Sequence, residues 1–304
     1  MLYGYWFGRK QLRVTETTYT SPQIPAAFNN YKIVHISDLH LSSFADSPDL
    51  LQRIIDTINA QQPDLICFTG DFIGFGVEEA IPFTQTLRQL HANDGIMSVL
   101  GNHDFALYHH GLTNAEKEEK VNKLTTYQRD TLGWQLLRNQ SYLIHRDSAY
   151  LQIIGVDNTS CQGQGFQTIS RGDLSAAITS LSQEPGTKSQ DISVTTKQTE
   201  VISLYSLFLA PESKIMQILL SHDPSHWRGE VVQQTDIPLT LSGHTHAGQV
   251  RLFGYPLSSI MFTESEGWYH IADQSLHINT GLGCTLPVRI GVPAEITVIT
   301  LQKQ

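Results

Sequence analysis

The chain has few cysteines, a deficit of basic charge and no long apolar run. Its three cysteines, Cys67, Cys161 and Cys284, lie far apart in 304 residues, so the sequence contains neither a disulfide framework nor a CxxC metal motif. The 20 basic residues are outnumbered by 29 acidic ones, and a net charge of -9 excludes a general nucleic-acid binder. No apolar run is long enough to span a bilayer, and no secretory signal peptide is visible.

The first thirteen residues, MLYGYWFGRKQLR, are unusual because four aromatic side chains are followed by three basic ones. Membrane interfaces favour this combination, but an aromatic arm that packs on the domain and leads into a strand fits equally well. We therefore expect an arm and a first strand over residues 1–30. A single domain over 31–304 follows, in which 183–215 is an insertion. The protein is expected at a membrane or otherwise in the cytoplasm.

Short apolar runs alternate with helical patterns through most of the chain, which indicates an α/β fold. The strands are predicted at 31–37, 64–70, 96–101, 150–156, 216–221 and 237–242. Helices are predicted from Pro48, over much of 78–91, over 113–132 and from about 172. The polar stretch 183–200 reads as a loop. The apolar stretch 201–210 is either docked on the core or a cap that takes an acyl chain or touches a bilayer.

Each of five predicted strands is followed by a metal-binding type of side chain. The carboxyl ends of strands in an α/β sheet are where ligands bind. Each short motif is weak alone, but five in order are not expected by chance. The donors are Asp38, His40, Asp71, Asn102, His222, His244 and His246.

All seven donors offer oxygen or nitrogen and none offers a thiolate. This set suits Mn, Fe or Zn at a catalytic centre, because a structural zinc site more often uses cysteine. Seven ligands are too many for one open catalytic metal ion. The sequence therefore predicts two metal ions that share a bridging carboxylate.

The order D-x-H, GD, GNHD, a lone histidine and GHTH resembles the calcineurin-like metallophosphoesterase superfamily, with a match from Tyr31 to Leu301. VHISDLH, SHDP, LSGHTHAGQ and the tail NTGLGCTLPVRIGVPAEITVITL are similar to its YkuE-like bacterial phosphodiesterase branch. Many members of that branch carry a membrane anchor before the domain, so the resemblance implies an anchor that is absent from this chain. The resemblance implies a four-layer α/β/β/α sandwich of two mixed β-sheets flanked by helices. Ala247 departs from the pattern, since a glycine often follows GHTH.

The resemblance also implies a role for each residue. Asp38, His40 and His246 would hold one metal ion, Asn102, His222 and His244 the other, and Asp71 would bridge them. His103 would contact the phosphate and protonate the leaving oxygen, and Asp104 would orient His103. Contacts to the substrate are expected from Asn102, His103 and Arg289.

The implied activity is hydrolysis of a phosphodiester or pyrophosphate bond at a membrane surface, and lipid-linked phosphate esters are among the expected substrates. A phosphomonoesterase or nucleotide phosphodiesterase with a soluble substrate is the alternative within enzymes. A non-catalytic scaffold that retains the fold is the alternative of another class.

Overall fold

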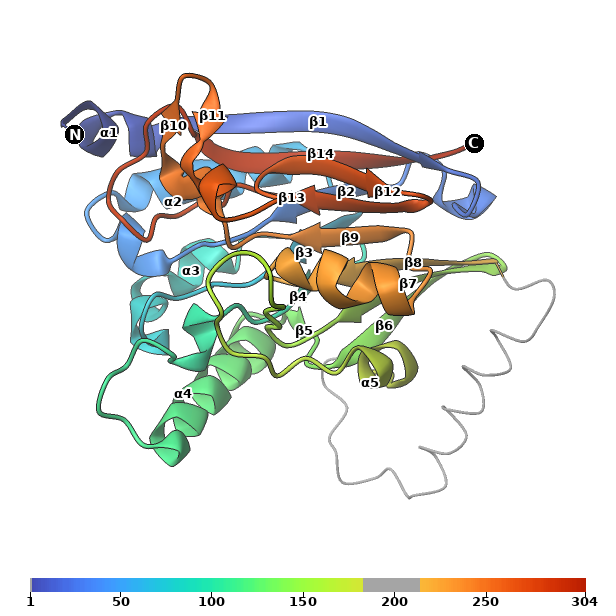
Figure 1. Cartoon of the computed structure of the whole chain (residues 1–304), viewed down its shortest axis with the longest axis horizontal. Coiled ribbons are helices and arrows are strands. Elements are labelled where there is room, and N and C mark those ends of the chain that lie inside the picture. Colours follow the sequence, from blue (N-terminus) through green and yellow to red (C-terminus); the bar gives the residue numbers. More distant parts are fainter. Residues whose placement is uncertain (1, 183–213) are drawn as a thin grey trace.

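Two six-stranded sheets packed face to face form the centre of the molecule, and helices cover their outer faces (Figure 1). The structure, a computed structural model, describes residues 2–182 and 214–304. The α/β/β/α sandwich implied by the motifs is confirmed. The predicted loop at 183–200 and the apolar stretch 201–210 lie outside the described residues, as does the expected insertion apart from 214 and 215.

Both sheets are mixed, because most neighbouring strands are parallel and three pairs, β14–β2, β12–β13 and β6–β7, are antiparallel. The first sheet contains, in order, β1 (Leu12–Ser21), β14 (Ala294–Lys303), β2 (Lys32–Ile36), β3 (Leu65–Phe68), β4 (Ile96–Ser98) and β5 (Gln135–Leu136). The second contains β12 (Gly267–Ile271), β13 (Gln274–Ile278), β9 (Leu239–Ser242), β8 (Lys214–Leu220), β7 (Ala149–Gly155) and β6 (Gln140–Arg146). A hairpin of β10 (Arg251–Leu252) and β11 (Tyr255–Pro256) stands outside them.

The helix predicted over 113–132 is matched by Asn114–Thr126 and by the π-helix Tyr127–Thr131 that continues it, whereas two other predicted helices are shorter than expected. The α-helices of the described residues are α1 (Leu2–Trp6), α2 (Pro48–Ala60), α3 (Thr84–Leu87), α4 (Asn114–Thr126), α5 (Leu174–Thr179) and α7 (Val232–Gln234). The helix expected over much of 78–91 is broken into two 3₁₀ turns and α3. Pro82 explains the break, because its ring cannot continue a preceding helix. Among the described residues, no helix has the length and apolar character needed to cross a membrane.

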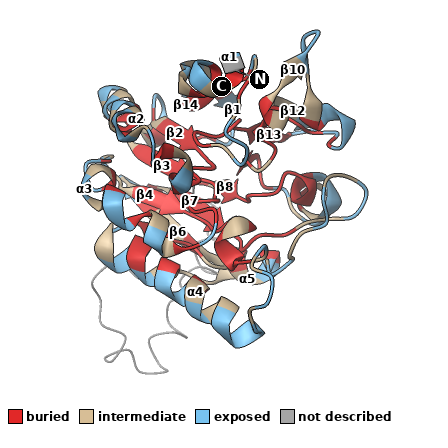
Figure 2. Ribbon diagram, turned by 90° about the vertical axis from the view of Figure 1, so that its left-hand side faces the viewer, coloured by how far each residue is buried: buried red, intermediate tan, exposed pale blue. Residues whose placement is uncertain are grey.

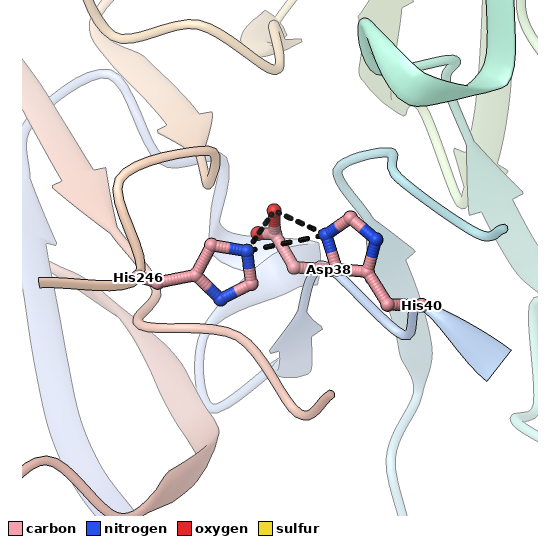
Figure 3. A group of neighbouring side chains, drawn as sticks. All are labelled: Asp38, His40 and His246. Atoms are coloured by element: carbon pink, nitrogen blue, oxygen red, sulfur yellow. Dashed lines mark hydrogen bonds and ion pairs between the residues drawn. The ribbon is translucent and has the colours of Figure 1, made fainter. Parts of the chain in front are cut away.

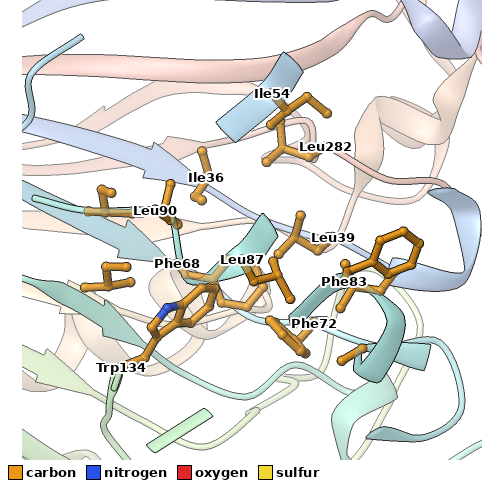
Figure 4. Close-up of a cluster of buried hydrophobic side chains, with 14 of the residues drawn as sticks. Ile36, Leu39, Ile54, Phe68, Phe72, Phe83, Leu87, Leu90, Trp134 and Leu282 are labelled. Carbon is orange, nitrogen blue, oxygen red and sulfur yellow. The ribbon is translucent and has the colours of Figure 1, made fainter. Parts of the chain in front are cut away.

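Three apolar layers hold the sandwich together. Ile33, Leu65 and Ile218 belong to the layer between the sheets. A second layer joins the first sheet to α2, α3 and α4, and Phe68, Phe72 and Trp134 pack there edge to face (Figure 4). The third lies between the second sheet and α5. Figure 2 shows buried residues concentrated in the strands and exposed ones on the outer helices and loops.

The amino-terminal segment is part of the domain rather than a free arm. β1 pairs with β14 over ten residues in parallel. Before it, α1 lies against the loop 288–290, where the Arg289 backbone N–H donates to the Gly4 carbonyl at 3.3 Å. The segment therefore connects the chain's start to the loop that follows β13.

Candidate metal centre

The predicted donors come from loops that follow five strands and meet at one end of the sandwich. Asp38 and His40 follow β2, Asp71 follows β3, Asn102 follows β4, His222 follows β8, and His244 and His246 follow β9. Five of the seven have a positive φ, from 39° at His40 to 71° at His244. A positive φ is uncommon and strained in residues other than glycine, so the surrounding packing must maintain it. Residues with this conformation cluster at functional sites.

One group of ligand atoms consists of Asp38, His40 and His246 (Figure 3). The Nε2 atoms of the two imidazoles are 3.2 Å apart. His246 Nε2 lies 3.3 Å from Asp38 Oδ1, and His40 Nε2 lies 3.8 Å from the same oxygen. The three side chains are buried and point toward a common centre.

A second group consists of Asp71, His222 and His244, and Asn102 lies beside it. His222 Nε2 is 3.3 Å from Asp71 Oδ2 and 3.1 Å from Asn102 Oδ1. The Asn102 amide nitrogen donates to the Tyr108 hydroxyl at 2.9 Å, which leaves the amide oxygen directed toward His222. This oxygen is the atom of asparagine that binds metal ions.

Asp71 lies between the two groups. Its Oδ2 atom is 3.5 Å from His40 Nε2 in the first group and 3.3 Å from His222 Nε2 in the second. Its Oδ1 atom accepts the His103 backbone N–H at 2.9 Å, which holds the carboxylate in place. The arrangement is that of a carboxylate shared by two cation sites.

The residues present fit metal ions. Asp38 Oδ1, which faces His246 Nε2 at 3.3 Å, is buried and has no hydrogen-bond partner within the described parts of the chain. A buried polar atom without a partner is costly unless something else satisfies it. Two facing imidazole nitrogens and a carboxylate oxygen form a donor set that Mn, Fe or Zn accepts.

The electrostatics of the centre also favour a positive charge between the two carboxylates. Burial raises the pKa of Asp38 to about 6. Burial would raise the pKa of Asp71 too, but the charges of His222 and His103 hold it well below its usual range. Burial disfavours charge on His222, yet Asp71 and Asp38 raise its pKa to about 10. The proton on His222 thus balances the carboxylates where a metal ion would do so.

The other histidines of the two groups are neutral for a physical reason. Burial lowers the pKa of His40 to about 3, and it lowers the pKa values of His244 and His246 as well. A neutral imidazole is the form that binds a metal ion.

The structure gives Asp104 a different contact from the expected one. Its carboxylate accepts the backbone N–H groups of Phe72, Ile73 and Gly101 at 2.9–3.2 Å, so it holds the loops that carry Asp71 and Asn102. The His103 ring is instead held by the Gly74 carbonyl, 3.1 Å from Nδ1. The expectation that Asp104 orients the His103 ring is corrected accordingly, because the Asp104 carboxylate is occupied by backbone N–H groups and makes no hydrogen bond to that ring.

Arg289 is fully buried beneath the first group rather than open to a substrate. Its guanidinium donates to the carbonyls of Thr280, Gly281 and Gly283, and its Nη2 atom is 3.4 Å from His246 Nδ1. The expected contact between Arg289 and substrate does not match this placement, because the side chain is fully buried and its Nη1 and Nη2 atoms donate to backbone carbonyls.

Two residues near the centre had no clear signal in the sequence. The Tyr108 ring packs on His103 in a tilted arrangement with centroids 4.4 Å apart, and its hydroxyl accepts a hydrogen bond from Asn102. Asp223 is buried beside His244, with Oδ2 3.8 Å from Nε2. Its position directly after His222 was the available hint.

The sequence model of the calcineurin-like phosphoesterase family matches residues 31–248. This range is more than two thirds of the chain and includes every predicted donor. The chain belongs to the calcineurin-like phosphoesterase family. Members of the family bind a dinuclear metal centre, so the protein is a metal-dependent phosphoester hydrolase. The groups of histidine and aspartate described above are its candidate metal-binding residues.

Individual relatives extend the match to nearly the whole chain. The metallophosphoesterase YkuE of Bacillus subtilis (strain 168) is 30% identical over 98% of this chain and 90% of its own length. A Danio rerio transmembrane protein with a metallophosphoesterase domain is 24% identical over 99% of this chain and 60% of its own. The UDP-2,3-diacylglucosamine pyrophosphatase LpxG of Chlamydia trachomatis serovar D is 28% identical over 94% of this chain and 88% of its own length. The chain spans less than two thirds of some relatives, such as the zebrafish protein.

Proposed function

We propose that this phosphoesterase hydrolyses phosphodiester or pyrophosphate bonds of amphipathic substrates at a membrane surface. The observation that carries the hydrolytic part of the proposal is the position of Asp71, whose Oδ2 atom lies within 3.5 Å of a histidine nitrogen from each donor group. In this scheme Asp38, His40 and His246 hold one metal ion, Asn102, His222 and His244 hold the other, and Asp71 bridges them.

The ions supply the charge that the reaction needs. When bound, a pair of metal ions activates water and neutralises charge on the transferring phosphoryl group. The chain's own residues keep this pair in place: Asp104 fixes the loops of Asp71 and Asn102, and Arg289 braces the turn beside His246.

His103 is the proposed proton donor to the leaving oxygen. Its Nδ1 atom faces the Gly74 carbonyl and donates to it, which leaves Nε2 as the atom that can exchange a proton with the substrate. The ring is only half covered and is packed between His40 and Tyr108, with centroids 4.8 and 4.4 Å away. His103 and Asn102 are therefore the proposed substrate contacts, whereas Arg289 acts by positioning.

The substrate class is supported by one relative and by the surroundings of the centre. LpxG is a pyrophosphatase with a diacylated sugar nucleotide as substrate, according to its name, and it shares 28% identity with this chain. The ring of Phe262 packs on His244 with centroids 5.6 Å apart, and the two residues before it, Ile260 and Met261, are exposed and apolar. Both favour a substrate with an apolar part.

A panel of substrates tests the proposal on protein reconstituted with Mn²⁺, Fe²⁺ or Zn²⁺. We expect two metal ions per chain by elemental analysis, and turnover of bis(p-nitrophenyl) phosphate and a lipid-linked pyrophosphate well above that of p-nitrophenyl phosphate. Preference for the monoester or for cyclic nucleotides would identify the enzyme as one with a soluble substrate. A chain that takes up no metal and turns over no ester would be a scaffold.

A further inference from the structure

An exposed apolar surface stands beside the metal centre. It is formed by residues 3–7, by residues 252–261 of the β10–β11 hairpin and the turn after it, and by Leu286; we call it the aromatic platform. These segments carry nine of the thirteen large hydrophobic side chains that are exposed in the described residues. In Figures 1 and 2, two views at right angles, α1 and the hairpin both stand at the top of the molecule. Such a gathering is unusual on a protein surface and marks an interaction site.

The three segments form one surface because the loop 286–291 joins them. The Arg289 backbone N–H donates to the Gly4 carbonyl in α1, and the Arg251 backbone N–H in the hairpin donates to the Ile290 carbonyl at 2.8 Å. The same loop leads to the metal centre through the Arg289 side chain, 3.4 Å from His246. The platform is therefore fixed relative to the site of the reaction.

The tip of the hairpin exposes an aromatic ring at some cost. Phe253 and Gly254 are the two central residues of the turn, and both have positive φ, 50° and 88°. This is the pattern of a type I′ turn, in which asparagine or aspartate normally precedes the glycine. A bulky phenylalanine is disfavoured in this conformation, and here its side chain is 100% exposed. Local stability does not explain this residue, whereas insertion of the ring into an apolar partner does.

We propose that the aromatic platform docks the protein on a phospholipid surface, with Phe253, Tyr255 and Ile260 entering the interface between headgroups and acyl chains. The proposal rests on the proposed function and adds its partner. Tyrosine and tryptophan suit this interface because each has an apolar body and a polar group, and the platform contains Tyr3, Trp6 and Tyr255. A projecting hairpin fits a deformable lipid layer better than it fits the flat, self-complementary contact of a second copy.

The aromatic platform contains no acidic residue of its own, so it does not repel phospholipid headgroups. Residues 1–13, 250–261 and 285–291 contain five basic residues and no acidic one, although the whole chain carries 29 acidic and 20 basic residues. Acidic side chains from elsewhere pair with three of the arginines: Asp46 with Arg9, Glu295 with Arg13, and Glu266 with Arg251. Docking thus avoids repulsion from lipid phosphates, while the apolar side chains supply most of the affinity.

Sedimentation with sucrose-loaded phosphatidylcholine vesicles tests the proposal on the whole chain. We expect the wild type to partition onto the vesicles, and the double variant Phe253→Ser/Tyr255→Ser to bind at least tenfold more weakly. Ile81→Ser is the matched control, because Ile81 is 60% exposed on a 3₁₀ turn outside the platform. Raising NaCl from 0.1 to 0.5 M should weaken binding less than about threefold, since the arginines are already paired.

Binding and chemistry are measured separately, so the two ideas fail separately. Turnover of bis(p-nitrophenyl) phosphate without vesicles tests the proposed function, and we expect it to be equal in the wild type, the double variant and the control. Equal vesicle binding by wild type and double variant, both with unchanged melting temperature, would overturn the docking surface. The proposal would also be overturned if the wild type did not bind vesicles but formed a dimer and the double variant stayed monomeric. The platform would then bind a second copy of the chain.

Discussion

Replacing Asp71 with asparagine removes one negative charge from the centre and preserves the shape of the side chain. An asparagine oxygen can still accept the His103 backbone N–H, which lies 2.9 Å from Oδ1, so the loop should keep its position. The atom that replaces Oδ2 faces His40 Nε2 at 3.5 Å and His222 Nε2 at 3.3 Å. The substitution therefore tests the shared carboxylate itself.

The size of the effect follows from the charge that is lost. Two unit charges about 4 Å apart interact by about 4 kcal/mol at an effective dielectric constant of about 20. A divalent ion would feel more than this, so about 4 kcal/mol is a lower estimate. It corresponds to a metal affinity at least about 10³-fold weaker. We expect turnover to be lost at any metal concentration that saturates only the wild type.

The assay combines metal binding, stability and turnover. Metal-free protein is titrated with Mn²⁺ or Zn²⁺ against a competing chelator, and the melting temperature and the hydrolysis of bis(p-nitrophenyl) phosphate are followed. The rise in melting temperature on metal addition should vanish in Asp71→Asn, because bound metal stabilises only the folded chain that binds it. Asp157→Asn is the control: Asp157 is equally buried but pairs with Arg138. Wild-type metal affinity and turnover in Asp71→Asn would refute the bridging role.

Three further predictions use other parts of the structure. In Gly101→Ala, the new Cβ atom would lie 2.6 Å from the Asp71 backbone nitrogen and closer still to Asp71 Oδ1. Turnover should therefore fall about 10²-fold, and the metal affinity should fall with it. Unchanged metal affinity would show that the loop moves aside without displacing Asp71. Burial lowers the pKa of His277 to about 4, below the unfolded value near 6.5; its stabilising contribution is thus complete above pH 6.5 and is lost as the pH falls toward 4. In urea unfolding, His277 should contribute about 2 kcal/mol of the stability that is lost between pH 7.5 and pH 5, beside the other buried histidines. His277→Gln should therefore lose less stability over this range than the wild type, and an equal loss in both proteins would contradict the prediction. Trp134→Ala should lower the free energy of unfolding by about 3–5 kcal/mol, because the ring is buried against Phe68 and Phe72. Trp6→Ala should lower it by less than about 1 kcal/mol, because Trp6 is 57% exposed. Similar losses in the two variants, measured by chemical denaturation, would argue against the described core.

Much of the fold could be predicted because its signals are local. The predicted strands at 31–37, 64–70 and 150–156 match β2, β3 and β7, since a buried strand must be a short apolar run with turn residues after it. The helix over 78–91 was overpredicted, because the composition of that segment is helical while Pro82 stops a continuous helix. The segment 183–213 is not described, so its predicted loop and cap stay predictions.

The sequence by itself determined which donors are available and that they follow strands, because strand order and residue type are written along the chain. Only the tertiary structure decided which atoms meet. His40 and His246 are 206 positions apart, yet their nitrogens lie 3.2 Å from each other. Long-range packing also placed Asp104 against backbone N–H groups, buried Arg289 beneath His246, and brought α1 beside the β10–β11 hairpin. A local pattern carries no information on such contacts, since they depend on how the two sheets pack and on which loops this packing brings together.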